Sequence, residues 1–199
     1  LGTIFLGVAT PTEGGAMGAT GALIMALARR RLSFSLLKQA MNTTAKLSTF
    51  VVFILVGARV FSLTFYGVNG HVWVEHLLTS LPGGQLGFLI VVNILIFVLA
   101  FFLDFFELSF IVIPLIGPVA DKLGIDLVWF GVLMTIVMEA GLIHPPVGMN
   151  LFVIRAQAPE IDIRAMYLGV IPFLFAPLVL IALLIVYPEI ALWLPRQVR

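Results

Sequence analysis

Hydrophobic residues run along this chain in long uninterrupted blocks separated by short polar breaks. Several blocks approach 20 residues, the length that an α-helix needs to cross a hydrocarbon core of about 30 Å. The ten-residue alternation that is typical of strands in membrane barrels does not occur in them. The pattern therefore predicts an all-α, polytopic membrane protein, with transmembrane helices interrupted at defined polar positions.

The breaks divide the chain into three predicted parts. These are scaffold-type helices with a connecting loop (1–84), a transport module (85–158) and a C-terminal transmembrane helix (159–199). Within the transport module, we expect a re-entrant helical hairpin over 85–117 and a discontinuous helix over 127–157. Irregular backbone at membrane depth survives only where protein buries it or a cavity hydrates it, and secondary transporters use it to build midplane sites.

Finer boundaries follow from the same pattern. We expect a short interfacial helix (33–42), a full span (43–64), a surface loop (65–83), a turn (118–126) and a last long span (166–194). The chain starts without Met, inside an apolar segment. We therefore interpret it as the C-terminal part of a longer membrane protein.

The first polar break has the signature of a helix start. Thr10 is in the N-cap position, Pro11 is at the first helical position and Glu13 is three residues after the cap, which predicts a capping box. The helix that follows ends in three consecutive arginines, 29–31, with Lys38 soon after. By the positive-inside rule, this connection is expected to face the cytoplasm.

A second break, FFLDFFE (101–107), is predicted to be the tip of the hairpin. A carboxylate at membrane depth is costly, so a cation-binding role for Asp104 is one interpretation. The alternative is that Asp104 caps the second arm, with Glu107 as its partner three residues later. For Glu107 we favour the capping role, and for Asp104 both interpretations stay open.

The third break, EAGLIHPPVGMN (139–150), contains two adjacent prolines that have no N–H to donate. They are expected to leave the carbonyls near residues 141–143 unbonded, and such carbonyls at the end of a half-helix are suited to bind Na⁺. The alternative is a simple proline kink between packed helices. Glu139, one turn earlier, is a further candidate ion ligand or proton-coupling group.

Three segments of the chain, GVATPTEGGAMGA (7–19), LDFFELSFIVIPLIGPVADKLGID (103–126) and VWFGVLMTIVMEAGLIHPPVGMNLFVI (128–154), resemble the large membrane subunit of tripartite ATP-independent periplasmic (TRAP) transporters. The resemblance covers about the C-terminal half of such a subunit. It implies the second inverted repeat of an elevator-type, ion-coupled importer of organic acids in a bacterial inner membrane. It also implies two partners, a small membrane subunit and a periplasmic substrate-binding protein. His144 stands where many members of the family have Thr.

These arguments together predict a site made mainly by backbone. The expected ion-binding residues are Asp104, Gly141, His144 and Pro145, and the expected substrate-binding residues are Pro146, Gly148 and Asn150. Na⁺ is the expected coupling ion, and we expect no organic cofactor. The half-helix that starts near Gly148 would direct its positive end toward a substrate carboxylate.

Other functions are less consistent with the sequence. A net charge of +1, with 61% hydrophobic and only 11% charged residues, argues against nucleic-acid binding, and the lack of cysteine excludes thiolate chemistry. His71, Glu75 and His76 match no metal-binding motif, and protease motifs such as HExxH are missing. We therefore expect a transporter subunit rather than an enzyme. An intramembrane enzyme or a channel that uses Asp104, Glu139 and His144 remains the alternative.

Overall fold

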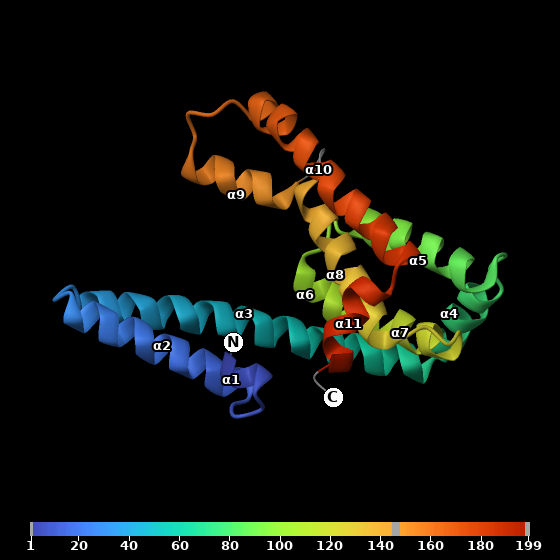
Figure 1. Cartoon of the computed structure of the whole chain (residues 1–199), viewed down its shortest axis with the longest axis horizontal. Helices are drawn as coiled ribbons and strands as arrows, with labels where there is room; N and C mark the ends of the chain where they lie inside the picture. The colour runs from blue at the N-terminus through green and yellow to red at the C-terminus, as the bar shows by residue number, and fades with distance from the viewer. Residues whose placement is uncertain (1, 145–147, 198–199) are drawn as a thin grey trace. The chain divides into compact units, whose positions relative to one another are not determined.

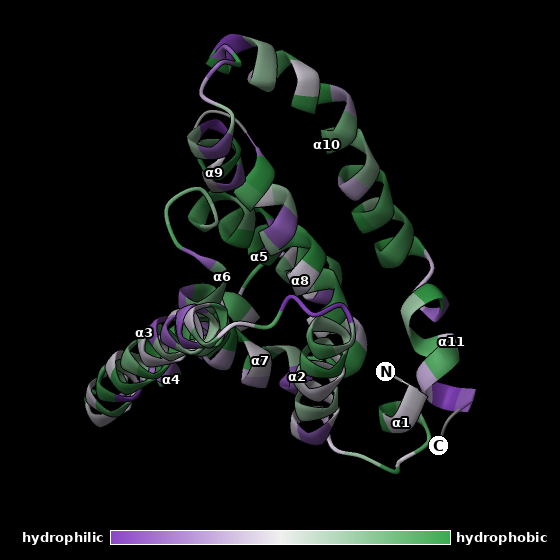
Figure 2. Cartoon of the chain, turned by 90° about the vertical axis from the view of Figure 1, so that its left-hand side faces the viewer, coloured by the Kyte–Doolittle hydropathy of each residue, from purple (hydrophilic) through white to green (hydrophobic). Residues whose placement is uncertain are grey.

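A computed structural model describes residues 2–144 and 148–197. In these residues the chain forms eleven α-helices and one π-helical segment, without any strand. The predicted all-α membrane class is thereby confirmed. Two helices, α3 (Phe34–Gly67) and α10 (Ile163–Val186), are long and apolar enough to cross a membrane. Figure 2 shows α10 as apolar along most of its length.

The described chain divides into two compact units, residues 2–53 and 54–197. The first contains α1 (Gly2–Phe5), α2 (Pro11–Ala28) and the first part of α3. The predicted capping box at the start of α2 is confirmed. The Glu13 amide donates to Thr10 Oγ1 (3.3 Å), and the Thr10 amide donates to Glu13 Oε2 (2.7 Å).

The predicted division of residues 33–64 into an interfacial helix and a separate span is wrong, because α3 is a single helix of 34 residues. No glycine or proline occurs from its start until Gly57, so nothing in that stretch breaks the helix. Its start is capped by Ser33, whose hydroxyl oxygen accepts from the Leu36 amide (3.1 Å). At 1.5 Å per residue, α3 is about 51 Å long and exceeds the hydrocarbon core.

The predicted loop over residues 65–83 is also largely helical. After a short break at Asn69, whose φ is +59°, helix α4 (Gly70–Thr79) begins. It meets α5 (Gly84–Leu99) at an angle of 119°, so the two together make a bent pair that counts as a third possible span by composition. Two glycines with positive φ, Gly83 and Gly84, make this sharp bend possible.

The core of the second unit is the contact between α5 and α8 (Leu127–Ile143), shown in Figure 1. Four residues spaced four positions apart, Phe88, Val92, Ile96 and the C-cap residue Ala100, are all buried. They form one face of α5, as expected for an amphipathic helix. On α8 the buried partners include Phe130, Leu133, Met134 and Val137.

These two helices approach each other closely at Gly141. A Cβ atom on Gly141 would lie 2.4 Å from the Ala100 Cβ and 3.0 Å from the carbonyl oxygen of Phe97. Any larger residue would therefore force the helices apart. This contact brings the C-terminal ends of α5 and α8 together.

The second arm of the predicted hairpin consists of α6 (Phe105–Glu107), the π-helical segment η1 (Leu108–Val112) and α7 (Ile113–Lys122). Pro114 explains the π segment, since its ring clashes with the carbonyl of the residue four before it. The predicted turn over 118–126 is too long, because α7 continues through Pro118 and only residues 123–126 turn.

The predicted last span over 166–194 is likewise two helices. Helix α10 ends at Val186, and α11 (Glu189–Gln197) follows. Pro188 has no N–H, so the Leu184 carbonyl loses its helical partner. Trp129 of α8 replaces that partner, because its buried indole Nε1–H donates to the Leu184 oxygen (2.8 Å). A side chain of α8 thus supplies the hydrogen-bond donor that the end of α10 lacks.

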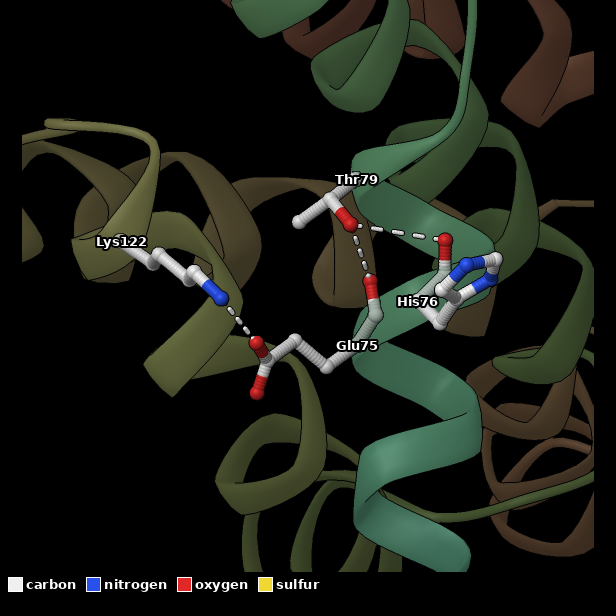
Figure 3. Close-up of polar contacts among 4 residues, drawn as sticks. All are labelled: Glu75, His76, Thr79 and Lys122. Atoms are coloured by element: carbon white, nitrogen blue, oxygen red, sulfur yellow. Dashed lines mark hydrogen bonds and ion pairs between the residues drawn. The ribbon is translucent and has the colours of Figure 1, made fainter.

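At the end of α7, where the second arm of the hairpin stops, a polar contact joins the hairpin to α4, as Figure 3 shows. Lys122 of α7 forms an ion pair with Glu75 of α4. In addition, the Gln85 side-chain amide of α5 donates to the Leu123 carbonyl (2.6 Å). These contacts fix the α4–α5 bend against the end of α7.

The Trp129 contact predicts a specific loss of stability. Replacing Trp129 with Phe keeps an aromatic ring but removes the indole N–H that donates to the Leu184 carbonyl. We expect the free energy of unfolding of the purified subunit to fall by about 1–3 kcal/mol, since a buried carbonyl is left without a partner. Thermal unfolding in detergent measures this. Trp73→Phe is the control because Trp73 is 65% exposed, and an equal loss in both variants would contradict the assignment.

The close contact at Gly141 predicts a second effect. Gly141→Ala places a methyl group against Ala100 and the Phe97 carbonyl, so we expect a destabilisation of roughly 1–3 kcal/mol. Gly131→Ala on the same helix is the matched control, because nothing lies within 4 Å of the added Cβ. Adding Ala100→Gly to Gly141→Ala is expected to restore part of the loss. Equal stability of the Gly141→Ala and Gly131→Ala variants would contradict this packing.

Candidate functional site

The hairpin tip lies between the end of α5 and the start of α6. Asp104 is half-buried there, and its Oδ1 accepts from the amides of Phe106 (2.7 Å) and Glu107 (3.0 Å). Glu107 returns the contact, since its Oε2 accepts from the Asp104 amide (3.4 Å). The capping role that we favoured for Glu107 is confirmed, and Asp104 is the N-cap residue of α6. Both bonds use one oxygen of Asp104, so the cap occupies half of the carboxylate.

The break after α8 begins with a tightened turn. The His144 amide donates to the Gly141 carbonyl three residues earlier (3.2 Å). The prediction that the Gly141 carbonyl is unbonded is therefore wrong: this turn supplies a donor in place of residue 145. The Leu142 carbonyl is different, because the residue four positions later is Pro146, which has no N–H.

Two of the predicted site residues, Pro145 and Pro146, lie outside the described residues. The described chain resumes at Gly148, which has a φ of +52° and is the N-cap of α9 (Met149–Gln157). A Cβ at this position would lie 3.3 Å from the Ile143 carbonyl oxygen, so the end of α8 and the start of α9 are close. Asn150 is exposed in the first turn of α9.

The structure brings the tip and the break together through aromatic rings. The His144 ring lies edge-on to Phe97 (5.1 Å between ring centroids) and stacks on Phe101 (5.5 Å). Phe101 is three residues before Asp104, at the start of the tip. With Gly141 packed on Ala100, the end of α8 is thus held against the end of α5 at three positions, Phe97, Ala100 and Phe101.

Glu139 does not take part in this contact. It is exposed on α8, whereas its neighbours Met138, Ala140 and Gly141 are buried. The structure places His71, Glu75 and His76 together on α4. Among the residues that the structure describes, no three His, Asp or Glu side chains are placed to hold a metal ion. The His71 ring instead stacks on Tyr66 (4.3 Å between centroids).

Two features near the site were not found from the sequence. One is the pair Phe97 and Phe101, whose spacing of four residues places both rings on one face of α5, although the sequence gives no sign that they meet His144. The other is Asn93, a single amide in the middle of an apolar helix. Its Nδ2 donates to the Leu89 carbonyl (2.6 Å), and its buried Oδ1 has no partner in the described fold.

A small apolar cavity of about 310 Å³ adjoins His144 on the side of α10. Its wall consists of aliphatic and aromatic side chains, namely Ile171, Leu174, Phe175 and Leu178. His144 therefore contacts Phe97 and Phe101 of α5 and also lines a cavity beside α10. Of the residues that line the cavity, His144 is the only polar one.

Comparison with known proteins adds independent information. Residues 1–190 match the family described as tripartite ATP-independent periplasmic transporter, DctM component. The chain is 31% identical over 197 residues to the C4-dicarboxylate TRAP transporter large permease protein DctM of Rhodobacter capsulatus, covering 98% of this chain and 44% of that protein. It is 29% identical over 202 residues to the sialic acid TRAP transporter permease protein SiaT of Haemophilus influenzae, covering 98% and 32%.

A third relative, the sialic acid TRAP transporter large permease protein SiaM of Vibrio cholerae, is 30% identical over 201 residues, covering 98% of this chain and 46% of that protein. The chain thus spans about half the length of the curated permeases that it matches, or less. The relatives are membrane permeases and not enzymes, in agreement with the apolar helices of the fold. The chain belongs to the family of TRAP transporter large permease subunits.

Proposed function

We propose that this chain forms the second half of a large permease subunit that imports organic acids, coupled to Na⁺ and supplied by a periplasmic substrate-binding protein. The family match supports transport, and the names of its relatives include C4-dicarboxylates and sialic acid as substrates of those proteins. The membrane is the bacterial inner membrane in this proposal, and a small membrane subunit is the second partner.

The observation that carries the proposal is the contact between the hairpin tip and the helix break. A proline break alone would be consistent with a kink, but here the break is held against a second polar interruption by the Gly141–Ala100 approach and by the His144 ring. Two interrupted helices that meet inside an apolar protein place main-chain oxygens where no lipid can satisfy them. Such oxygens are suited to bind a cation.

In the proposed site, Na⁺ is bound by oxygen atoms at the tip and the break. Asp104 contributes the carboxylate oxygen that the cap does not use. The Leu142 carbonyl, without a helical donor, joins the predicted group of Gly141, His144 and Pro145. The Gly141 carbonyl accepts from the His144 amide, but a carbonyl oxygen has a second lone pair and remains able to contact an ion.

The substrate carboxylate is proposed to bind at the start of α9. The N-terminal turn of a helix presents unbonded N–H groups and the positive end of the helix dipole, and both favour an anion. Gly148 forms that start, and Asn150 adds an exposed side-chain amide in the first turn. Pro146 belongs to the same predicted group. An ion held between tip and break would lie beside this anion, so each would favour binding of the other.

In this proposal, Na⁺ binding orders the hairpin tip, and this ordering couples the ion to substrate transport. With Na⁺ bound, the tip is held closed against the break, and the hairpin with its broken helix moves as one body past the long spans. Without Na⁺, the Asp104 charge is uncompensated at membrane depth, which disfavours the closed tip. The proposal therefore requires that substrate uptake depends on the Na⁺ gradient.

The charge of Asp104 separates the ion-binding role from the capping role. Asn caps a helix about as well as Asp does, so Asp104→Asn is expected to keep the fold while removing the charge. In proteoliposomes that contain the complete transporter, we expect the Na⁺ concentration for half-maximal uptake of succinate or sialic acid to rise at least about tenfold. A lost charge-assisted contact of about 1.5–3 kcal/mol corresponds to that factor.

Asp126→Asn is the matched control for this measurement. Asp126 caps α8 in the same manner, accepting from the amides of Val128 (2.8 Å) and Trp129 (3.1 Å), but it is outside the tip. Its replacement is expected to leave the Na⁺ dependence unchanged. If Asp104→Asn also leaves it unchanged, Asp104 is a cap only. Uptake that is indifferent to the Na⁺ gradient in the unmodified transporter would refute the coupling itself.

A further inference from the structure

Arg59 lies inside the most apolar part of α3. From residue 47 to residue 70 it is the only charged side chain, and its neighbours are aliphatic or aromatic except for a few hydroxyl residues. A cation in such a stretch is costly unless it pairs with an anion, reaches water or serves a function. In the residues that the structure describes, two ion pairs form, Lys122–Glu75 and Arg196–Glu189, and neither includes Arg59.

The Arg59 side chain lines a cavity of about 290 Å³ in the second unit. Leu55, Ala58, Arg59 and Ser62 form one wall, and they are spaced so that they share one face of α3. Ala58 is only 4% exposed and Ser62 is half-buried, whereas Leu55 and Arg59 are exposed, so this face is packed within the unit only in part. Ser62 places a hydroxyl group one turn after Arg59, on the same side of the helix.

Phe110 and Pro114 form the opposite wall, at the π-helical segment of the hairpin. The Ile113 amide donates to the Leu108 carbonyl in the five-residue pattern of a π-helix. Pro114 has no N–H, so it can make neither the next bond of that pattern, to Ser109, nor the α-helical bond to Phe110. Beside the cavity, the hairpin is thus irregular in a way that a single proline explains.

The chemistry of the cavity selects the kind of ligand. Arg59 offers up to five N–H donors in a planar group, and Ser62 offers an O–H donor. No acidic side chain is among the lining residues. Two donors, one of them cationic, in an otherwise apolar wall match an oxyanion, and Arg binds the two oxygens of a carboxylate or phosphate side by side. A volume near 300 Å³ is at the small end of ligand sites and suits one such group with its nearest atoms.

We propose that Arg59 and Ser62 form an oxyanion-binding site between α3 and the second arm of the hairpin. Its ligand is a carboxylate or a phosphate, supplied either by an anionic lipid headgroup or by a carboxylate solute. The solute source rests on the proposed function, whereas the lipid source does not. The ligand connects a long span to the hairpin arm, so its presence favours one position of the hairpin relative to α3.

The test uses the complete transporter, including the remaining part of the permease and its partners. In nanodiscs that contain phosphatidylglycerol and phosphatidylcholine, native mass spectrometry counts the phosphatidylglycerol molecules retained after extraction. In proteoliposomes, the KM for succinate uptake is measured in parallel. Arg59→Gln is expected either to lose one retained phosphatidylglycerol, which assigns the lipid source, or to raise KM about tenfold or more, which assigns the solute source.

Two further variants make the result specific. Arg59→Lys keeps the charge but loses the planar donor group, so it is expected to give an intermediate effect, and Ser62→Ala a smaller loss of the same kind. Arg164→Gln is the matched control, since Arg164 is exposed as Arg59 is but does not line the cavity. Equal lipid loss in the Arg59 and Arg164 variants, or no change in lipid retention and KM for Arg59→Gln, would overturn the proposal. In that case Arg59 only extends toward the membrane surface.

Should Arg59→Gln unfold, the Arg59→Lys and Ser62→Ala variants decide the question, with thermal midpoints measured beforehand. If the unmodified transporter shows no Na⁺-dependent uptake, the proposed function fails, and the lipid measurement still tests the site. The two failures are therefore distinguishable.

Discussion

Prolines remove main-chain donors inside or just after apolar helices of this protein, and lipid offers no substitute for them. Each released carbonyl must find a donor elsewhere or become part of a site. At the end of α10, the indole of Trp129 supplies the donor to Leu184, and two helices are joined as a result. At the end of α8, the His144 amide tightens the last turn onto Gly141. The Leu142 carbonyl receives no such helical donor, because residues 145 and 146 are both proline, and it belongs to the ion site that we propose.

A glycine makes this arrangement possible. Because Gly141 has no side chain, α8 approaches the Ala100 methyl group and the Phe97 carbonyl of α5 closely enough for the His144 ring to reach Phe101. The hairpin tip and the helix break, about 40 residues apart in sequence, therefore lie side by side. Asp104 is at the same time a helix cap and a carboxylate at this junction, so its two oxygens can serve different purposes.

Predictions from sequence succeeded where a short local pattern has a single physical outcome. The Thr10–Glu13 and Asp104–Glu107 pairs are capping boxes because the spacing of cap and acid fixes the geometry. Boundaries were less predictable. We predicted a short interfacial helix over 33–42 and a separate span over 43–64, but a change in polarity does not end a helix that has no breaker. Likewise, Pro118 did not end α7, whereas Pro188 with its neighbours did end α10.

Thus the amino-acid sequence alone determined the membrane class, the positions of the two central interruptions and the family, since hydrophobic length and proline chemistry act locally. Only the tertiary structure decided which carbonyls regain a donor, which rings surround His144, and that Glu139 is outside the contact. Those outcomes depend on the distance between helices that are far apart in the chain, and that distance is set by the packing of residues such as Gly141 and Ala100.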